Sequence, residues 1–205
     1  MKFKVIKFPG EKTTYIAPTW DEMNQLAFEI SQKIIQDEKK IDRIATLAKG
    51  GWPMTRSMVD FLSIEKVVSF GVKFYQQINR RLDKPYIYQD IPERISGENV
   101  LLFDDVADTG KSLDFARDYL INHGAKSVTL ATLFYKPHST VRPDYYAAET
   151  SAWIIFPYEA VDAIKVLRQK WQRQGFKTKE IKKRFEQLGI NYAYAKLIPK
   201  GGEIE

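Results

Sequence analysis

The fold is decided by Asn99-Val-Leu-Leu-Phe-Asp-Asp-Val-Ala-Asp-Thr-Gly-Lys-Ser-Leu113. Residues 100–103 form a short unbroken apolar run, which is typical of a parallel strand buried on both faces. Asp104 and Asp105 follow at once, so we expect them at the carboxyl end of that strand, where open α/β sheets bind ligands. An amphipathic helix then opens at the small polar residues 108–112. The stretch predicts a strand, a loop and a helix with a ligand site between them.

The loop has the properties of an anion site. Backbone N–H groups of residues 108–112 would point at a phosphate, and the dipole of the following helix would favour negative charge there. Gly110 permits a positive φ or a close backbone approach that a larger residue resists. The stretch is not a P-loop, because that motif needs glycine five residues before Gly-Lys-Ser and Asp105 stands there. By themselves the two acids also fit an ordinary solvated turn.

The whole string resembles the PRPP-binding signature of type I phosphoribosyltransferases. The resemblance implies that Asp104 and Asp105 hold the ribose hydroxyls of PRPP, directly or through water on a bound Mg²⁺. It also implies that Asp108 acts as an acid/base group at N7 of a purine. The residues expected to anchor the 5′-phosphate are Asp108, Thr109, Gly110, Lys111 and Ser112.

A second glycine-rich turn follows the predicted strand at residues 41–48. Its sequence is Lys49-Gly-Gly-Trp-Pro53, and Pro53 suits the first turn of a helix. Read alone, this is a tight turn with a surface lysine. The family resemblance implies instead that Lys49 and Gly50 bind pyrophosphate. It also implies a flap over PRPP at the polar residues 75–85, with the choice among Arg80, Arg81 and Lys84 as the pyrophosphate contact left open.

Lys136 closely follows another predicted strand, at residues 127–134. Together with Trp153-Ile-Ile-Phe-Pro157, it resembles the base-binding half of 6-oxopurine phosphoribosyltransferases, particularly archaeal xanthine-guanine types. That resemblance implies that Lys136 faces the exocyclic oxygen of the purine, Trp153 stacks on its ring, and main chain at Ile154 reads its edge. A surface lysine and a core tryptophan are the alternatives.

After the segment that resembles the family, two basic amphipathic helices are predicted at residues 159–173 and 177–188. We therefore expect a phosphoribosyltransferase core at 1–157 and a helical extension at 158–205. The extension resembles that of crenarchaeal enzymes that act on adenine, whereas Asp108 and Lys136 match the 6-oxopurine pattern. The sequence interpretation favours adenine, with AMP as product, and keeps a 6-oxopurine as the alternative.

Composition sets the remaining expectations. The 205 residues, 44% of them hydrophobic, suffice for one full core, and the absence of cysteine excludes disulfides and thiolate metal sites. No signal peptide or bilayer-spanning run is visible, so we expect a soluble cytoplasmic protein. The formal charge of +6 fits a polyanionic ligand. A nucleic-acid-binding regulator that uses basic helices 165–184 is the alternative of a different class.

These observations predict an α/β fold with a mainly parallel twisted sheet flanked by helices, plus a small helical C-terminal unit. The expected reaction joins PRPP and a purine base with Mg²⁺, and yields a nucleoside monophosphate and pyrophosphate. We expect a homodimer, and we expect neither a membrane nor a nucleic acid as partner.

Overall fold

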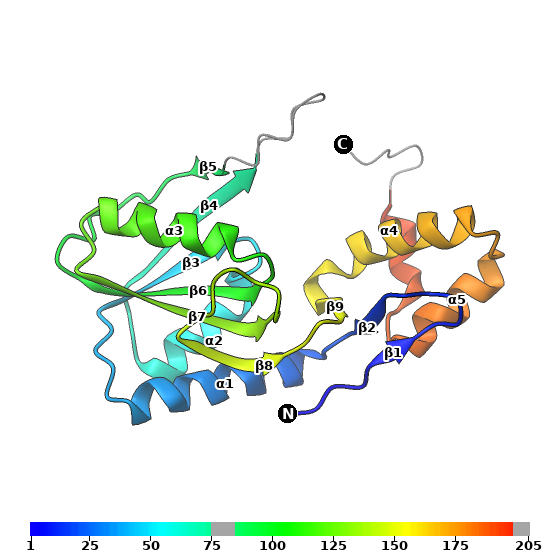
Figure 1. Cartoon of the computed structure of the whole chain (residues 1–205), viewed down its shortest axis with the longest axis horizontal. Helices are drawn as coiled ribbons and strands as arrows, with labels where there is room; N and C mark the ends of the chain where they lie inside the picture. Colours follow the sequence, from blue (N-terminus) through cyan, green and yellow to red (C-terminus); the bar gives the residue numbers. More distant parts are fainter. Residues whose placement is uncertain (75–84, 199–205) are drawn as a thin grey trace. The chain divides into compact units, whose positions relative to one another are not determined.

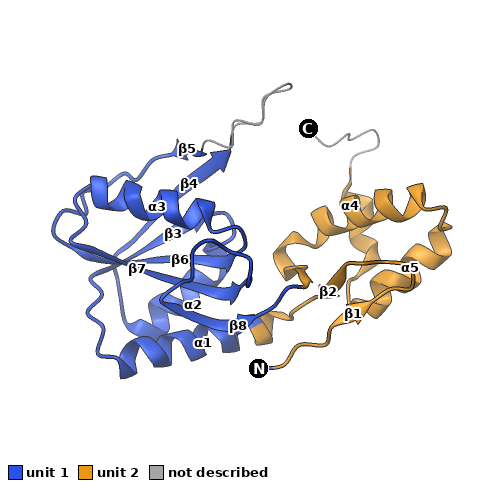
Figure 2. Cartoon of the chain, in the orientation of Figure 1, with its two compact units in different colours: residues 1, 23–151 blue, residues 2–22, 152–205 orange. Residues whose placement is uncertain are grey.

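The computed structural model describes residues 1–74 and 85–198. The chain forms two compact units, one of residue 1 with residues 23–151 and one of residues 2–22 with residues 152–205 (Figure 2). These units do not follow the predicted division at residue 157, because residues 15–16 pair with residues 153–154, residues 6–7 pair with residues 14–15, and all of them belong to the unit of the C-terminal helices. The division into family core and extension stays a prediction.

The first unit is built on a six-stranded sheet of order β5-β4-β3-β6-β7-β8 (Figure 1). Strand β5 is antiparallel to β4, and every other neighbouring pair is parallel. This confirms the α/β fold with a mainly parallel sheet. The strands are β3 (Arg43–Ala48), β4 (Val67–Phe74), β5 (Pro85–Gln89), β6 (Asn99–Ala107), β7 (Ser127–Tyr135) and β8 (Tyr145–Glu149).

Three helices flank this sheet. They are α1 (Trp20–Gln36), α2 (Trp52–Leu62) and α3 (Lys111–Asn122), with α3 on one face and α1 and α2 on the other (Figure 1). Along β6, Val100 and Leu102 join the cluster that contains the buried residues of α3. None of the helices in the described residues is long and apolar enough to cross a membrane.

The signature strand is longer than its apolar run suggested. The sequence predicts an end after Phe103, but β6 continues to Ala107. The reason is pairing with β7, in which Asp104 lies opposite Thr132 and Ala107 opposite Tyr135. Asp104 and Asp105 are therefore held by the sheet rather than by a free turn.

The second unit contains a small sheet of order β1-β2-β9 and the C-terminal helices. Both predicted amphipathic helices are present, and their apolar faces meet around the fully buried Trp171. The elements are β1 (Ile6–Lys7), β2 (Thr14–Ile16), β9 (Trp153–Ile154), the 3₁₀ turn η1 (Pro157–Glu159), α4 (Ala160–Arg173), α5 (Thr178–Gln187) and the 3₁₀ turn η2 (Tyr192–Leu197).

A buried carboxylate lies at the centre of this unit. Oε1 of Glu11 accepts hydrogen bonds from Trp171 Nε1 and Arg184 Nη1, both at 2.6 Å. Oε2 accepts from Lys170 Nζ at 2.6 Å and from the Tyr15 hydroxyl at 2.5 Å. Two basic residues of the predicted amphipathic helices, Lys170 and Arg184, thus pair with a carboxylate inside the unit.

The Glu11 network should make a large contribution to stability. Burial alone would raise the pKa of Glu11, but hydrogen bonds from Lys170, Tyr15 and Trp171 hold it below its ordinary value. Glu11→Gln leaves the buried Arg184 and the half-buried Lys170 without their charged partner, so we expect the free energy of unfolding to fall by about 3–5 kcal/mol. Urea unfolding of the full chain measures this, with Glu186→Gln on the exposed side of α5 as a matched control.

The same network gives stability a pH dependence of defined sign. A carboxyl whose pKa is lower in the folded state contributes fully above its unfolded value of about 4.3. That contribution is lost as pH falls through the lower folded value. The wild type should therefore lose more stability on acidification than Glu11→Gln does, and parallel pH profiles of the two would contradict this account.

Candidate active site

Three of the predicted site segments lie at one edge of the large sheet. Strands β3, β6 and β7 are adjacent and parallel, so their carboxyl ends point the same way. Lys49 follows β3, Asp104 and Asp105 lie near the carboxyl end of β6, and Lys136 follows β7. Lys49 and Lys136 are 87 residues apart in sequence, and the fold brings both to the edge that carries the two acids.

The acid pair lies against the first glycine-rich loop. A Cβ atom placed on Gly50 would lie 2.5 Å from Oδ2 of Asp105, so only glycine lets this main chain approach the carboxylate so closely. Asp105 is buried, and its main-chain N–H donates to Oδ1 of Asp104 at 3.0 Å. The peptide bond between Ala48 and Lys49, which opens the loop, is cis. The segments predicted to bind pyrophosphate and ribose are therefore in contact.

The predicted phosphate loop connects β6 to α3 in the expected way. Gly110 has a φ of +83°, the left-handed conformation that glycine adopts readily, and α3 begins at the next residue. The Gly110 carbonyl accepts from Asp114 N at 3.0 Å, which starts the helical ladder. Main-chain N–H groups at a helix start can bind an anion, and the anion site expected at residues 108–112 stays a prediction.

Residues 138–140, which follow β7 and were not among the predicted site residues, pack on this loop. Nε2 of His138 lies 2.8 Å from Oδ1 of Asp108. Thr140 donates to the Thr109 carbonyl through its main-chain N–H at 3.1 Å and through its hydroxyl at 2.9 Å. A Cβ on Gly110 would meet Ser139 Oγ at 2.7 Å. The polar run Lys136-Pro-His-Ser-Thr140 after a strand was the signal for this contact.

Lys136 lies beside the end of β6. Its main-chain N–H donates to the Ala107 carbonyl at 3.0 Å, and the residue is buried. Burial lowers the pKa of Lys136, and the nearby Asp108 carboxylate opposes that shift in part. A buried ammonium close to a carboxylate is a strong hydrogen-bond donor for a ligand oxygen, because it can donate but cannot accept.

Trp153 and Ile154 belong to the second unit. Strand β9 pairs in parallel with β2, which places Trp153 beside Tyr15 with ring centroids 5.7 Å apart. Trp153 is half-buried and Ile154 is buried. The main-chain N–H of Ile155 donates to the Ile16 carbonyl at 2.8 Å, so the small sheet already uses that donor. The proposed base contacts of Trp153 and Ile154 stay predictions.

The donor set at the sheet edge fits Mg²⁺. This ion is usually held by one or two carboxylates together with substrate phosphates and water, and Asp104 and Asp105 supply such a pair. Within residues 1–74 and 85–198, no group of three or more His, Asp or Glu side chains could form a protein-only metal cage. A bound Mg²⁺ stays a prediction. Arg80, Arg81 and Lys84 of the predicted flap lie outside the described residues.

Residues 19–165 match the phosphoribosyl transferase domain family, and the chain belongs to that family. It is 25% identical to xanthine-guanine phosphoribosyltransferase of Idiomarina loihiensis over 143 residues, which cover 69% of this chain and 84% of the relative. Hypoxanthine-guanine phosphoribosyltransferase of Streptococcus thermophilus is 28% identical, with 55% of this chain and 64% of the relative covered.

A solved structure gives a similar result. The purine phosphoribosyltransferase from Pyrococcus horikoshii is 31% identical to this chain, with a TM-score of 0.64. The superposition covers 70% of this chain and 93% of the other. These comparisons confirm the family and the fold that the signature stretch predicted.

Proposed function

We propose that this protein transfers the phosphoribosyl group of PRPP to a 6-oxopurine base, and forms a purine nucleoside 5′-monophosphate and pyrophosphate. The single observation that best supports this is the contact of the Gly50 main chain with the Asp105 carboxylate. It joins the predicted pyrophosphate loop to the predicted ribose-binding acids. Family membership and the names of the relatives support the reaction and the class of base.

The proposed chemistry depends on positioning and charge. As the bond from C1 of ribose to pyrophosphate breaks, positive charge develops on the ribose ring, and the carboxylates of Asp104 and Asp105 would hold the ribose hydroxyls next to it. The Lys49 ammonium and the Gly50 main chain would bind the departing pyrophosphate. Bound Mg²⁺ would supply further positive charge to the pyrophosphate oxygens.

The remaining groups would bind the 5′-phosphate of PRPP and the purine base. Main-chain N–H groups around Thr109 and Gly110 would anchor the 5′-phosphate at the start of α3. Asp108 would exchange a proton with N7 of the purine, since ribosylation at N9 requires the ring to lose a proton. The contact with His138 at 2.8 Å would keep the Asp108 side chain in place.

The choice of base differs from the first preference of the sequence interpretation. That preference was adenine, based on the helical extension, whereas the named relatives act on xanthine, guanine or hypoxanthine. The chemistry of Lys136 agrees with the relatives, because an ammonium donates to a keto oxygen and has no acceptor for an exocyclic amine. The comparisons therefore favour a 6-oxopurine over adenine.

Lys136→Ala tests the base assignment. Loss of one charged hydrogen bond should reduce kcat/KM with a 6-oxopurine by roughly ten- to over a hundredfold, corresponding to about 1.5–3 kcal/mol. Burial lowers the pKa of Lys136. As pH rises, wild-type activity should therefore fall at a lower pH than it would if this lysine had its ordinary pKa. Initial rates with guanine, hypoxanthine, xanthine and adenine measure both effects.

Lys126→Ala provides the matched control, since this exposed lysine precedes the amino end of the same strand. Its rates should equal those of the wild type. Wild-type turnover of adenine above that of all three 6-oxopurines would overturn the proposed base and leave the transferase assignment intact. The homodimer also stays a proposal, which light scattering of the purified chain can test.

A further inference from the structure

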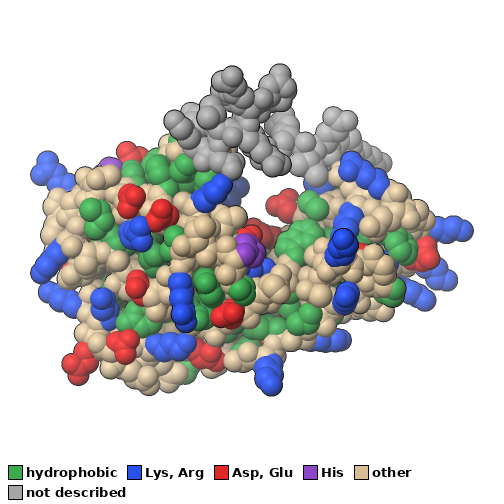
Figure 3. Space-filling view, viewed as in Figure 1, with side chains coloured by type: hydrophobic (Ala, Val, Ile, Leu, Met, Phe, Trp, Pro, Cys, Tyr) green, Lys and Arg blue, Asp and Glu red, His purple; other side chains and the backbone are tan. Residues whose placement is uncertain are grey.

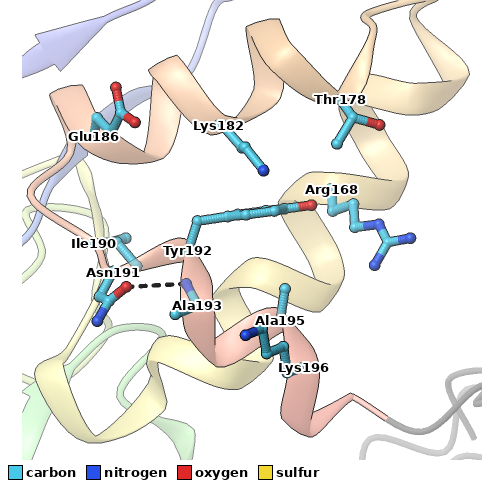
Figure 4. Close-up of a pocket in the computed structure, with 10 residues that line it drawn as sticks. All are labelled: Arg168, Thr178, Lys182, Glu186, Ile190, Asn191, Tyr192, Ala193, Ala195 and Lys196. Carbon is cyan, nitrogen blue, oxygen red and sulfur yellow. Dashed lines mark hydrogen bonds between the residues drawn. The ribbon is translucent and has the colours of Figure 1, made fainter.

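A concave site lies within the C-terminal helical unit, and it shares no residue with the signature loops. Residues of α4, α5 and η2 enclose a pocket of about 590 Å³ (Figure 4). Pockets of this size hold metabolites and cofactors in other proteins. The reaction proposed above uses none of its residues.

The pocket has a fixed aromatic wall. The Tyr192 side chain crosses its middle (Figure 4), and this ring stacks on the buried Phe185 with centroids 5.3 Å apart. Oδ1 of Asn191 accepts from Ala193 N at 3.0 Å and caps the turn that carries Tyr192. Ile190, which is buried, and Ala195 add apolar lining. These contacts preform a surface suited to a flat, weakly polar group.

The edges of the pocket are basic. Arg168, Lys182 and Lys196 line it together with one acid, Glu186. Figure 4 shows Lys182 pointing over Tyr192, and its Nζ lies 5.9 Å from the ring centroid. Figure 3 shows further Lys and Arg side chains on the surface of this unit.

The described residues give none of the three lining cations a carboxylate within salt-bridge distance. Lys170 and Arg184, on the same two helices, are instead bound to Glu11. The pocket therefore carries an excess of positive charge in a concave, partly apolar setting, which favours an anion. Inorganic phosphate would satisfy the cations but would leave the aromatic and aliphatic wall unused.

We propose that this pocket binds a nucleoside phosphate, with the phosphate among Arg168, Lys182 and Lys196 and the base along the Tyr192 wall. The ligand has two sources with the same chemistry, a free mononucleotide or the 5′-phosphorylated end of a nucleic acid strand. The proposal does not depend on the transferase reaction, because none of its residues belongs to the loops that would bind PRPP.

Calorimetric titration of the full chain with AMP tests the proposal. Arg168→Ala with Lys182→Ala removes one arginine from α4 and one lysine from α5 inside the pocket. Arg173→Ala with Lys183→Ala removes the same residue types from the same helices at exposed positions outside it. Any AMP bound at the signature loops contributes equally to both titrations. We expect AMP affinity at the helical-unit site to fall roughly ten- to a hundredfold in the pocket variant only.

Further titrations show whether base and phosphate are both needed, and whether the ligand is a mononucleotide or the end of a strand. Adenosine and inorganic phosphate should each bind the site much more weakly than AMP. A short 5′-phosphorylated oligoadenylate that binds more tightly than AMP, with the same loss in the pocket variant, would identify a strand end as the source. Weaker binding of the oligoadenylate would identify the mononucleotide.

Three results would overturn the proposal: wild-type AMP affinity in both double variants, an equal loss of affinity in both, or phosphate binding as tight as that of AMP. Circular dichroism shows whether the pocket variant is folded. Lys182→Ala alone, at an exposed position, provides the second variant if it is not, with a smaller loss expected and wild-type affinity as the contrary result.

Discussion

Replacement of Asp104 and Asp105 together by asparagine is expected to lower turnover with PRPP by roughly a hundred- to a thousandfold or more, the effect of removing charge from a preorganised site. The fold should survive, because the amide oxygen of the introduced asparagine can still accept the hydrogen bond that Asp104 Oδ1 accepts from Asp105 N. The chemical loss is the negative charge beside the ribose. Initial rates at saturating PRPP and base measure it.

The matched control removes two acids from the neighbouring helix. Asp114 and Asp118 are exposed on α3, so Asp114→Asn with Asp118→Asn changes the net charge equally and should leave turnover unchanged. If both double variants turn over at nearly the wild-type rate, the acid pair is an ordinary strand end and plays no part in the reaction.

Gly110→Ala is expected to have the second large effect. The residue has a φ of +83°, and the new Cβ would lie 2.7 Å from both Ser139 Oγ and Val141 N. Because one of these atoms belongs to the backbone, the loop itself must move. The N–H groups around residue 110 then no longer point at the phosphate. We expect affinity for PRPP and for nucleotide to fall at least about tenfold, the effect of one charged hydrogen bond. Calorimetry measures it.

Gly97→Ala is the control that distinguishes the steric clash at residue 110 from the cost of placing alanine at a positive φ. Gly97 has a φ of +78°, almost that of Gly110, but a Cβ there meets nothing within 4 Å. Both variants place alanine in the left-handed region at a similar cost in stability. Only Gly110→Ala should lose phosphate binding. A similar change in affinity for both variants would show that general destabilisation is responsible.

Local signals account for the parts of the fold that the sequence predicted. Thr19 and Glu22 form the two reciprocal hydrogen bonds that a Thr-x-x-Glu spacing at a helix start predicts. Glu22 N donates to Thr19 Oγ1 at 3.2 Å, and Thr19 N donates to Glu22 Oε2 at 2.7 Å. The strand, loop and helix around Gly110 also follow from adjacent residues. Patterns of this kind involve positions only a few residues apart, so one sequence is enough to read them.

Long-range contacts account for what was missed. Strand β6 runs past its apolar residues because β7 pairs with it, and no property of residues 104–107 alone reveals that ladder. His138 reaches Asp108 from 30 residues away, and Glu11 reaches Arg184 across 173 residues. The pairing of Lys170 and Arg184 with Glu11 could not be read from the sequence, since the periodicity of α4 and α5 does not show which distant carboxylate they meet.

The most direct test of the central claim is product analysis with PRPP, Mg²⁺ and each of guanine, hypoxanthine, xanthine and adenine. The proposed function predicts stoichiometric nucleoside monophosphate and pyrophosphate with at least one 6-oxopurine, and at most slow turnover of adenine. It also predicts that the Asp104→Asn, Asp105→Asn variant forms roughly a hundredth of that product or less in the same time. Absence of nucleotide and pyrophosphate with all four bases, from folded wild-type protein, would contradict the claim.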